Sequence, residues 1–554
     1  MRPTDQDYRE ALAGHAGRVE RFRRGEIPAD AWRPIRLSYG LYYQLDHTSH
    51  MQRIKVPGGQ LSADQLEVLA NITDQYGRGI GHWTTRQDLQ IHWVPVEGIV
   101  DLYEQLHAVG ITTRGACADS VRNVTGCPFA GAAPDEAFDI TPYVVAAHEY
   151  FLFNPLNLTL PRKFKIAIEG CPADCAQCPV NDIGAYAKIG ADGRRGFALV
   201  AGGGLGAQPF LAVPVAEFIP DEDLLIWFEA IVRVQHRHGE RANRNKARMK
   251  YVVKKMGHER FRATVEAEAE RVAAERGAAL REQVRALVAE HRVPPVQHAS
   301  PTGVAPQPGF ARWRETNVRQ HREPELAIVV VQLPLGDVSG EQMRLLARVA
   351  RQYGNGTLRA TNDQNLVLPA VPHAALAAVH AELREAGLDD PGAGTIVDVV
   401  SCPGMDYCSL AITRSMGVAE RLRSHLLDDP DTSDGFPARL GRFSVKVSGC
   451  PNSCGQHHVA DIGLTGHSVS GDDGLQRPYY SLLVGGAVGE GQARIGQRLG
   501  RFAEEDAPAA IAALARYYES ERHRGESFPM FVQRVGTAAL RSVAEAATRI
   551  AGAA

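Results

Sequence analysis

The chain has 554 residues, of which 44% are hydrophobic and 23% are charged, a composition typical of a globular protein with several domains. Lysine and arginine number 61, aspartate and glutamate number 64, and the net charge is −3, which gives no support for a general nucleic-acid or anionic-membrane binder. The N-terminus is charged and carries no apolar signal segment, and no long uncharged apolar stretch follows, so we expect no secretion, no membrane span and a cytoplasmic protein.

Sequence elements recur in the same order in the two halves of the chain. Three pairs of segments match, at offsets of 277, 277 and 279 residues. They are Leu61–Ala70 with Val338–Ala347, Thr84–Leu89 with Thr361–Leu366, and Gly170–Cys175 with Gly449–Cys454. Agreement of this length and order indicates two copies of one unit of about 250 residues, fused by duplication.

Each copy begins with a predicted strand, helix, strand and helix. β-Branched residues mark the first strands, and a serine that can cap the helix stands at the start of each first helix. These elements are Arg53–Pro57, 62–76, Leu89–Val94 and Ile99–Val109 in the first copy, and Ala327–Gln332, 339–353, Leu366–Pro369 and His373–Ala386 in the second.

The second part of each copy mixes strands with helices, which favours an α+β organisation. The strands predicted there are Lys163–Glu169 and Phe443–Ser448. Between the copies, Arg260–Arg292 predicts a solvated, charged helix rather than a coiled coil, because its apolar seam is thin. Residues 293–308 contain prolines and glutamines and are predicted to be a linker.

Nine cysteines are clustered along the chain, and in a reducing compartment they need a role other than disulfides. The second copy holds Cys402 and Cys408 in a C-x5-C arm, and Cys450 and Cys454 in a C-x3-C arm. Structural zinc arms usually have two to four intervening residues, so the longer arm suits a [4Fe–4S] cluster better, whose thiolates have more varied spacing. Zinc and a set of simply buried thiols are the alternatives.

This motif resembles the signature of the siroheme-dependent nitrite and sulfite reductases, with a proline after Cys402 and Cys450 and with Asn452 inside the second arm. The resemblance extends from about residue 50 to Ser527–Gly536 and includes the duplicated layout. It implies an α+β, internally duplicated nitrite/sulfite reductase fold with two ferredoxin-like half-domains and two siroheme- and cluster-binding α/β domains. It also implies that Cys402, Cys408, Cys450 and Cys454 hold a [4Fe–4S] cluster, and that Cys454 is the proximal ligand of the siroheme iron.

On this resemblance we expect six segments. They are an N-terminal extension (1–50), the first ferredoxin-like half-domain (51–115), the first siroheme- and anion-binding domain (116–259), a charged helix and linker (260–323), the second half-domain (324–390) and the [4Fe–4S]/siroheme domain (391–554).

Positive side chains of the first copy are candidates for binding a small oxyanion, because arginine donates forked hydrogen bonds and lysine acts as a point charge and proton source. Alternation along a strand places Lys163 and Lys165 on one face. By the resemblance, Arg86, Arg122, Lys163 and Lys165 face the substrate. In the second copy Asp363 stands where Arg86 does, so the first copy would provide the anion site and the second the cluster.

The resemblance also implies residues that support the cofactors. Arg162 and Asn452 would support the macrocycle or the iron centre, and Arg248 and Lys250 would lie near the siroheme carboxylates. A charged, solvated helix face is the alternative for the last two.

Two features bear on the substrate. Nitrite enzymes of the family tend to have an asparagine at the position of Lys165, so this lysine favours six-electron reduction of sulfite to sulfide. The loop Gly126–Gly131, with Asp135 and Glu136, resembles the nitrite branch instead and favours reduction of nitrite to ammonia. The chain has no Walker-type or convincing dinucleotide motif, so electrons would come from ferredoxin or a flavoprotein. A non-catalytic iron–sulfur or siroheme carrier is the alternative from another class.

The first copy keeps cysteines at positions 127, 171, 175 and 178. Alignment with the second copy puts Ala133 where Cys408 would be, so the set of four is incomplete. These thiols are either remnants packed as small apolar side chains or ligands of a second metal centre, in which Cys178 would restore the count.

Overall fold

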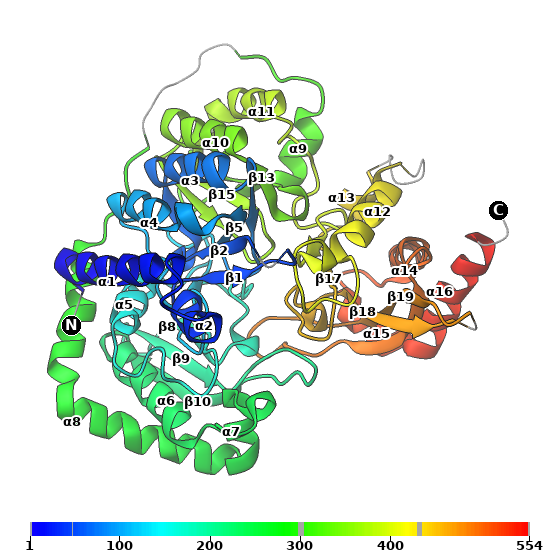
Figure 1. The fold of residues 1–554 in the computed structure, drawn as a ribbon. Helices are drawn as coiled ribbons and strands as arrows, with labels where there is room; N and C mark the ends of the chain where they lie inside the picture. The colour runs from blue at the N-terminus through cyan, green and yellow to red at the C-terminus, as the bar shows by residue number, and fades with distance from the viewer. Residues whose placement is uncertain (1–2, 47, 297–303, 429–434, 472, 552–554) are drawn as a thin grey trace.

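The duplicated order of elements produces four five-stranded sheets, two in each half of the chain (Figure 1). The computed structural model describes residues 3–46, 48–296, 304–428, 435–471 and 473–551. Within these residues, no helix is both long enough and apolar enough to span a membrane.

Residues before the first copy fold onto it. The helices are α1 (Asp5–Arg23) and α2 (Ala29–Ser38), and the short strand β1 (Leu41–Tyr43) pairs with β2 (His50–Ile54). Thr4 caps α1 in a capping box with Asp7, which satisfies two otherwise unpaired groups at the helix start. The N-terminal segment thus supplies an edge strand to the first sheet.

The two half-domain sheets exchange one strand each. The first sheet has the order β1-β2-β5-β4-β13 and the second β11-β12-β15-β14-β3, so β3 of the first copy completes the sheet of the second copy and β13 does the converse. The strands are β3 (Gln60–Ser62), β4 (Ile80–Trp83), β5 (Leu89–Val94), β11 (Val318–Gln320), β12 (Leu326–Val331), β13 (Asp337–Ser339), β14 (Thr357–Ala360) and β15 (Leu366–Pro372).

Helices α3 (Ala63–Tyr76) and α10 (Gly340–Tyr353) lie against each other over these sheets (Figure 1). Ser62 and Ser339 begin them with matching capping boxes, as the sequence predicted. One apolar core contains residues of both half-domains, including Leu66 and Leu346. The remaining helices of this part are α4 (Ile99–Ala108), α9 (Phe310–Asn317) and α11 (Leu376–Glu385).

The other two sheets follow one plan, in which three parallel strands are extended by an antiparallel pair. In the first copy the strands are β6 (Thr125–Gly126), β7 (Ile166–Glu169), β8 (Ile183–Ile189), β9 (Arg195–Ala201) and β10 (Val213–Pro220). In the second they are β16 (Val400–Ser401), β17 (Val445–Ser448), β18 (Ile462–Ser470), β19 (Gln476–Val484) and β20 (Gln497–Ala503).

Helices cover both sheets. Around the first lie α5 (Thr141–Leu152), α6 (Leu224–His238), α7 (Met249–Met256) and the long α8 (His258–Glu290), and around the second lie α12 (Ser415–Asp428), α13 (Phe436–Leu440), α14 (Ala507–Glu521), α15 (Phe528–Val535) and α16 (Thr537–Ala551). The α8 helix packs on α6 and α5 and buries Phe261 and Val272. The charged helix predicted at Arg260–Arg292 therefore exists, but part of its surface is core.

Several predicted boundaries differ from the structure. The strand predicted as Arg53–Pro57 is β2 (His50–Ile54), and the strand predicted from Phe443 begins at Val445. The strand predicted from Lys163 begins at Ile166, and only Phe164 makes an isolated bridge, to Val121. The strand predicted as Leu366–Pro369 continues to Pro372. Part of the predicted linker, residues 297–303, lies outside the described residues. The duplication and the mixed helix and strand content are confirmed.

Candidate functional site

Arg86 lies in the turn between β4 and β5. Its guanidinium donates to the Asn181 side-chain oxygen at 2.8 Å and to the Asn123 carbonyl at 2.7 Å. The neighbouring Gln87 adopts φ 58° and donates to the carbonyls of Gly126 and Ala360. These contacts fix the turn between the two copies and leave the buried Nε of Arg86 without a partner among the described residues.

Arg122 is held by the backbone of its own loop. Its terminal nitrogens donate to the carbonyls of Ala116, at 3.1 Å, and Ala118, at 2.7 Å, while its buried Nε has no partner within the described chain. Because the side chain is 8% exposed, the charge lies in a region of low dielectric, where its attraction for an anion is stronger than in water.

Lys163 and Lys165 flank the buried Phe164. This extended segment keeps the predicted alternation, although it precedes β7. Burial, reinforced by Arg122, lowers the pKa of Lys163 to about 7. Burial and the adjacent Arg86 place the pKa of Lys165 well below its usual value. Neither amine makes a hydrogen bond to any described residue, so both are free to contact an anion, whose negative charge would favour their protonated forms.

Two more cations belong to this group and were missed from the sequence. Arg53 and Lys55 alternate at the end of β2 as Lys163 and Lys165 do before β7. Arg53 lies 4.0 Å from the Asp88 carboxylate. Burial lowers the pKa of Lys55 to about 8, and burial raises that of Asp88 to about 6. The R-x-K spacing was the signal that could have found Arg53 and Lys55.

The supporting residues take different positions. Arg248 caps α7 and pairs with Asp182 at 2.8 Å, and the same carboxylate accepts the backbone N–H of Lys165 at 2.8 Å. Arg248 is therefore anchored beside Lys165. Arg162 pairs with Asp119 at 3.4 Å.

Lys250 lies near Arg248 and Asp182, and Asn452 lies in the second cysteine arm. Lys250 lies in the first turn of α7 and donates to the Leu205 carbonyl at 3.0 Å, so its charge is already engaged with the backbone. Asn452 is exposed and hydrogen-bonds the Cys450 sulfur. The cofactor contacts expected for these residues stay predictions.

The cysteine arms of the second copy follow two adjacent parallel strands. Cys402 comes directly after β16 and Cys450 just after β17. Because these strands are adjacent and parallel, both arms begin at the carboxyl ends of neighbouring strands. The Gly449 N–H lies 3.3 Å from the Cys402 sulfur. A Cβ at Gly455 would lie 2.0 Å from the Val447 carbonyl oxygen, so glycine is required where the chain turns back after Cys454.

The donor set of this second-copy site fits a cluster. Cys454 lies within electrostatic range of Cys402, Cys408 and Cys450. These four sulfurs do not converge within 4.8 Å as the ligands of one ion would, whereas another described group does. Four thiols with this wider separation fit a cluster of several irons better than a single ion.

Contacts between the copies bring the cations and the cysteines together. The Thr85 hydroxyl donates to the Cys454 carbonyl at 2.8 Å, and the Gln456 side chain donates to the Thr85 carbonyl at 3.2 Å. Lys163 and Arg53 both lie within electrostatic range of Cys454. The site therefore lies at the junction of the copies, with its positive charge from the first and its thiols from the second.

The positions of the second copy that correspond to Arg86 and to the Lys163–Lys165 segment have different side chains and different partners. Asp363, which corresponds to Arg86, pairs with Lys446 at 2.9 Å. Strand register aligns Lys446 with Ala167 and Ser444 with Lys165. The single lysine of this strand therefore corresponds to neither Lys163 nor Lys165.

The cysteines of the first copy form a tighter group than those of the second. Ligand atoms of Cys127, Glu169, Cys171 and Cys175 all lie within 4.8 Å of one another. Cys178 does not take part, because its buried sulfur faces the carbonyls of Ala167 and Ala185 at 3.7 Å. The idea that Cys178 restores a set of four is therefore wrong, and Glu169 stands in the fourth place.

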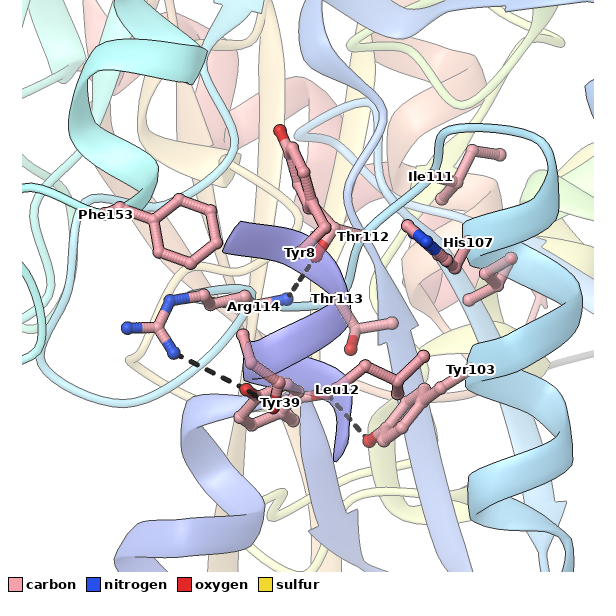
Figure 2. Close-up of a pocket in the computed structure, with 12 residues that line it drawn as sticks. Tyr8, Leu12, Tyr39, Tyr103, His107, Ile111, Thr112, Thr113, Arg114 and Phe153 are labelled. Carbon is pink, nitrogen blue, oxygen red and sulfur yellow. Dashed lines mark hydrogen bonds between the residues drawn. The ribbon is translucent and has the colours of Figure 1, made fainter. Parts of the chain in front are cut away.

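The cavity drawn in Figure 2 lies elsewhere, between α1, α4 and the loop to Arg114. Phe153 and Tyr8 line it, and the Arg114 guanidinium reaches the Tyr39 hydroxyl at 3.5 Å. Its volume of about 30 Å³ accommodates a water molecule but not a macrocycle. None of the predicted site residues lines it.

Comparisons with known proteins agree with the duplicated layout. Residues 117–272 and 392–550 match the model of the nitrite and sulphite reductase 4Fe-4S domain, and residues 43–109 and 319–386 match that of the nitrite/sulfite reductase ferredoxin-like half domain. Of the solved structures, that of the Mycobacterium tuberculosis NirA protein is similar with a TM-score of 0.79 and 25% identity, over 97% of this chain and 96% of that one.

Curated relatives divide between two activities. The chain is 29% identical to the assimilatory ferredoxin-dependent nitrite reductase of Haloferax mediterranei, with 94% of this chain and 88% of the relative covered. It is 32% identical to the ferredoxin–nitrite reductase of Synechococcus elongatus (84% and 85% covered). It is 29% identical to sulfite reductase [ferredoxin] 2 of Mycolicibacterium paratuberculosis (90% and 84% covered).

Proposed function

The chain belongs to the nitrite and sulphite reductase family, and from this premise we propose that it reduces sulfite to sulfide with six electrons. The catalytic centre would be a siroheme joined through the Cys454 thiolate to a [4Fe–4S] cluster on Cys402, Cys408, Cys450 and Cys454. The observation that carries the choice of sulfite is Lys165, a half-buried lysine beside Arg86 for which no side-chain hydrogen bond is found among the described residues.

The residues at the junction fit these groups. Buried guanidinium nitrogens of Arg53, Arg86 and Arg122 lack partners within the described chain, as expected of side chains that face carboxylates or an oxyanion. The four thiols beside them have the donor chemistry of an iron–sulfur cluster. When bound, the siroheme would supply an open iron position for the anion and the cluster would supply electrons to it.

The protein would contribute positioning and protons. Arg86 and Arg122 are fixed by backbone and amide contacts, so they would hold anion oxygens with little reorganisation. Each oxygen removed from sulfite takes two protons and leaves as water. Lys163 suits proton delivery, because burial and Arg122 bring its pKa to about 7, where a group donates and regains a proton readily at neutral pH.

Charge and shape favour sulfite over nitrite. Sulfite has three oxygens and carries up to two negative charges, whereas nitrite has two oxygens and one charge. A second ammonium group at Lys165 matches the larger anion. The loop that resembles the nitrite branch, Gly126–Gly131 with Glu136, contacts residues outside the proposed anion site. Glu136 pairs with Arg322 at 3.0 Å, and Phe129 stacks under Arg319. Reduction of nitrite to ammonia on the same scaffold is the second candidate, supported by the relatives that are nitrite reductases.

We expect the electron donor to be ferredoxin, as the names of several relatives state for those proteins, with a flavoprotein as the alternative.

The test is anaerobic turnover of the holoenzyme with reduced viologen, with sulfite and nitrite offered in parallel and sulfide and ammonia quantified. A larger kcat/KM for sulfite, which Lys165→Asn shifts towards nitrite, is the expected result. A preference for nitrite in the unaltered protein would refute the assignment to sulfite. Turnover of neither anion by a protein with full cofactor content would favour the electron carrier.

A further inference from the structure

The first copy contains a second group of metal-binding side chains, separate from the proposed catalytic centre. We propose that Cys127, Cys171, Cys175 and Glu169 bind a single divalent ion of the zinc type. Cys127 is 1% exposed, Glu169 1% and Cys171 7%, and Cys175 is half-buried. Glu169 is the last residue of β7, and the three cysteines lie in the loops that follow β6 and β7, in the first copy rather than in the copy that holds the cluster arms.

Distances distinguish a single ion from a cluster. The Cys127 and Cys171 sulfurs are 3.6 Å apart, and all four ligand atoms lie within 4.8 Å of one another. Zinc–sulfur bonds of about 2.3 Å in a tetrahedron place neighbouring sulfurs about 3.8 Å apart. The separation also exceeds the roughly 2.05 Å of a disulfide bond. A tetrahedral ion therefore fits this spacing without movement of the backbone.

Glu169 has the capacity to be the fourth ligand. One carboxylate oxygen accepts the N–H groups of Gly170 and Cys171, and the other accepts the N–H of Ala176 at 2.7 Å. A carboxylate has about four lone-pair positions, so the second oxygen keeps one free. Backbone donors that hold a ligand in this way orient it towards the metal.

Nearby charge balances the site. Three thiolates, one carboxylate and a divalent ion together carry two negative charges. Arg319, Arg359 and Arg442 of the second copy lie within electrostatic range of these cysteines. A buried dianionic centre needs such partners. The ion would thus be held by the first copy alone, with its excess negative charge facing arginines of the second copy.

Zinc content gives the test. The full-length holoenzyme, Cys175→Ser and the control Cys178→Ala are purified anaerobically from cells supplied with zinc, and zinc and iron are measured by mass spectrometry. We expect about one zinc per chain in the unaltered protein and the control, and less than about 0.2 in Cys175→Ser. Equal zinc in all three would overturn the proposal, and so would iron in excess of the siroheme and cluster.

X-ray absorption at the zinc edge tests the unaltered protein directly, so the result does not depend on the folding of a variant. Three sulfurs at about 2.3 Å and one oxygen at about 2.0 Å are expected. An all-oxygen and nitrogen shell would show surface-bound zinc and refute the site, as would a Cys127–Cys171 disulfide found by peptide mapping after anaerobic alkylation. Neither measurement depends on which anion the enzyme reduces.

Discussion

The junction between the copies contains two related sets of side chains, and they differ in how their charges are satisfied. On one side, Lys163 and Lys165 have ammonium groups without hydrogen bonds to described residues. On the other, Asp363 pairs with Lys446, and the Ser444 hydroxyl donates to Asp461 at 2.7 Å. Lys446 thus has a carboxylate partner, whereas the amines of Lys163 and Lys165 are left for an external partner, as the proposed anion site requires.

The cysteines of the two copies differ in how closely their sulfur atoms gather. In the second copy the four cysteines proposed as cluster ligands do not gather within 4.8 Å, whereas in the first copy the ligand atoms of three cysteines and a glutamate do. Each copy has therefore kept one half of a site and altered the other half. On the proposed function, the duplicated scaffold would separate anion binding from electron supply while both still meet at one junction.

The largest effect is expected from removing a cluster thiolate. Cys402→Ser should abolish the visible absorption of the bound cofactors and all turnover, because four thiolates hold the cluster. Cys178→Ala, a buried cysteine that faces only backbone carbonyls, is the matched control and should keep both. Absorption spectra and viologen-linked turnover measure the difference, and full activity in Cys402→Ser would contradict the assignment of the cluster.

Replacing Arg86 with the residue found at the equivalent position of the second copy should lower the activity nearly as much. Arg86→Asp places a carboxylate where Asp363 stands in the other half, and we expect kcat/KM to fall by about 10²–10³-fold, as when a fixed donor to a developing anion is lost. Steady-state kinetics measure this effect. Arg86→Lys keeps the charge and should recover part of the activity, whereas equal loss in both variants would indicate a structural role.

Proton linkage at Lys163 predicts a pH dependence of intermediate size. Only the protonated ammonium attracts an anion, so above pH of about 7, the pKa that burial and Arg122 give it, KM for nitrite should rise by up to about tenfold per pH unit. Nitrite is the better probe because it stays a monoanion over this range. Lys163→Met should remove the dependence, and an unchanged profile would exclude Lys163 as the titrating group.

The same pKa also predicts a trend in stability. Because the pKa of Lys163 is lower in the folded than in the unfolded chain, the unfolded chain binds more protons between about pH 7 and 10.5. The contribution of this lysine therefore favours folding more as pH rises through that window. Denaturant titrations at pH 7 and 9 measure the free energy of unfolding. Its change from pH 7 to pH 9 should be more favourable to folding in the unaltered protein than in Lys163→Met.

The smallest effect should come from the second copy. Asp363→Asn removes the partner of Lys446, whose side chain is 5% exposed, and should lower the free energy of unfolding by about 1–2 kcal/mol while kcat/KM stays within about twofold. Urea unfolding and steady-state kinetics measure the two quantities. A large loss of activity would show that the second set of side chains also takes part in the reaction.

Much of the fold was predictable because the sequence contains it twice. The β5 strand is found at its predicted bounds, and Ser62 and Ser339 begin the two helices as expected. The strand exchange was not predictable, since β3 and β13 have three residues each and their pairing depends on tertiary contacts. For the site, motifs pointed to Arg86 and to the four cysteines of the second copy, whose roles stay predictions. Arg53 and Lys55 lay in a segment interpreted only as a strand, and no spacing rule links Glu169 to the cysteines.

The exchange of β3 and β13 has a consequence for what counts as one folding unit. Each half-domain sheet is completed by a strand from the other copy, so a single copy alone would expose an unpaired edge, which invites association. Two free copies would satisfy that edge only by forming a reciprocal, twofold symmetric dimer. The covalent connection between the copies turns that bimolecular assembly into an intramolecular one, whose completion no longer depends on protein concentration.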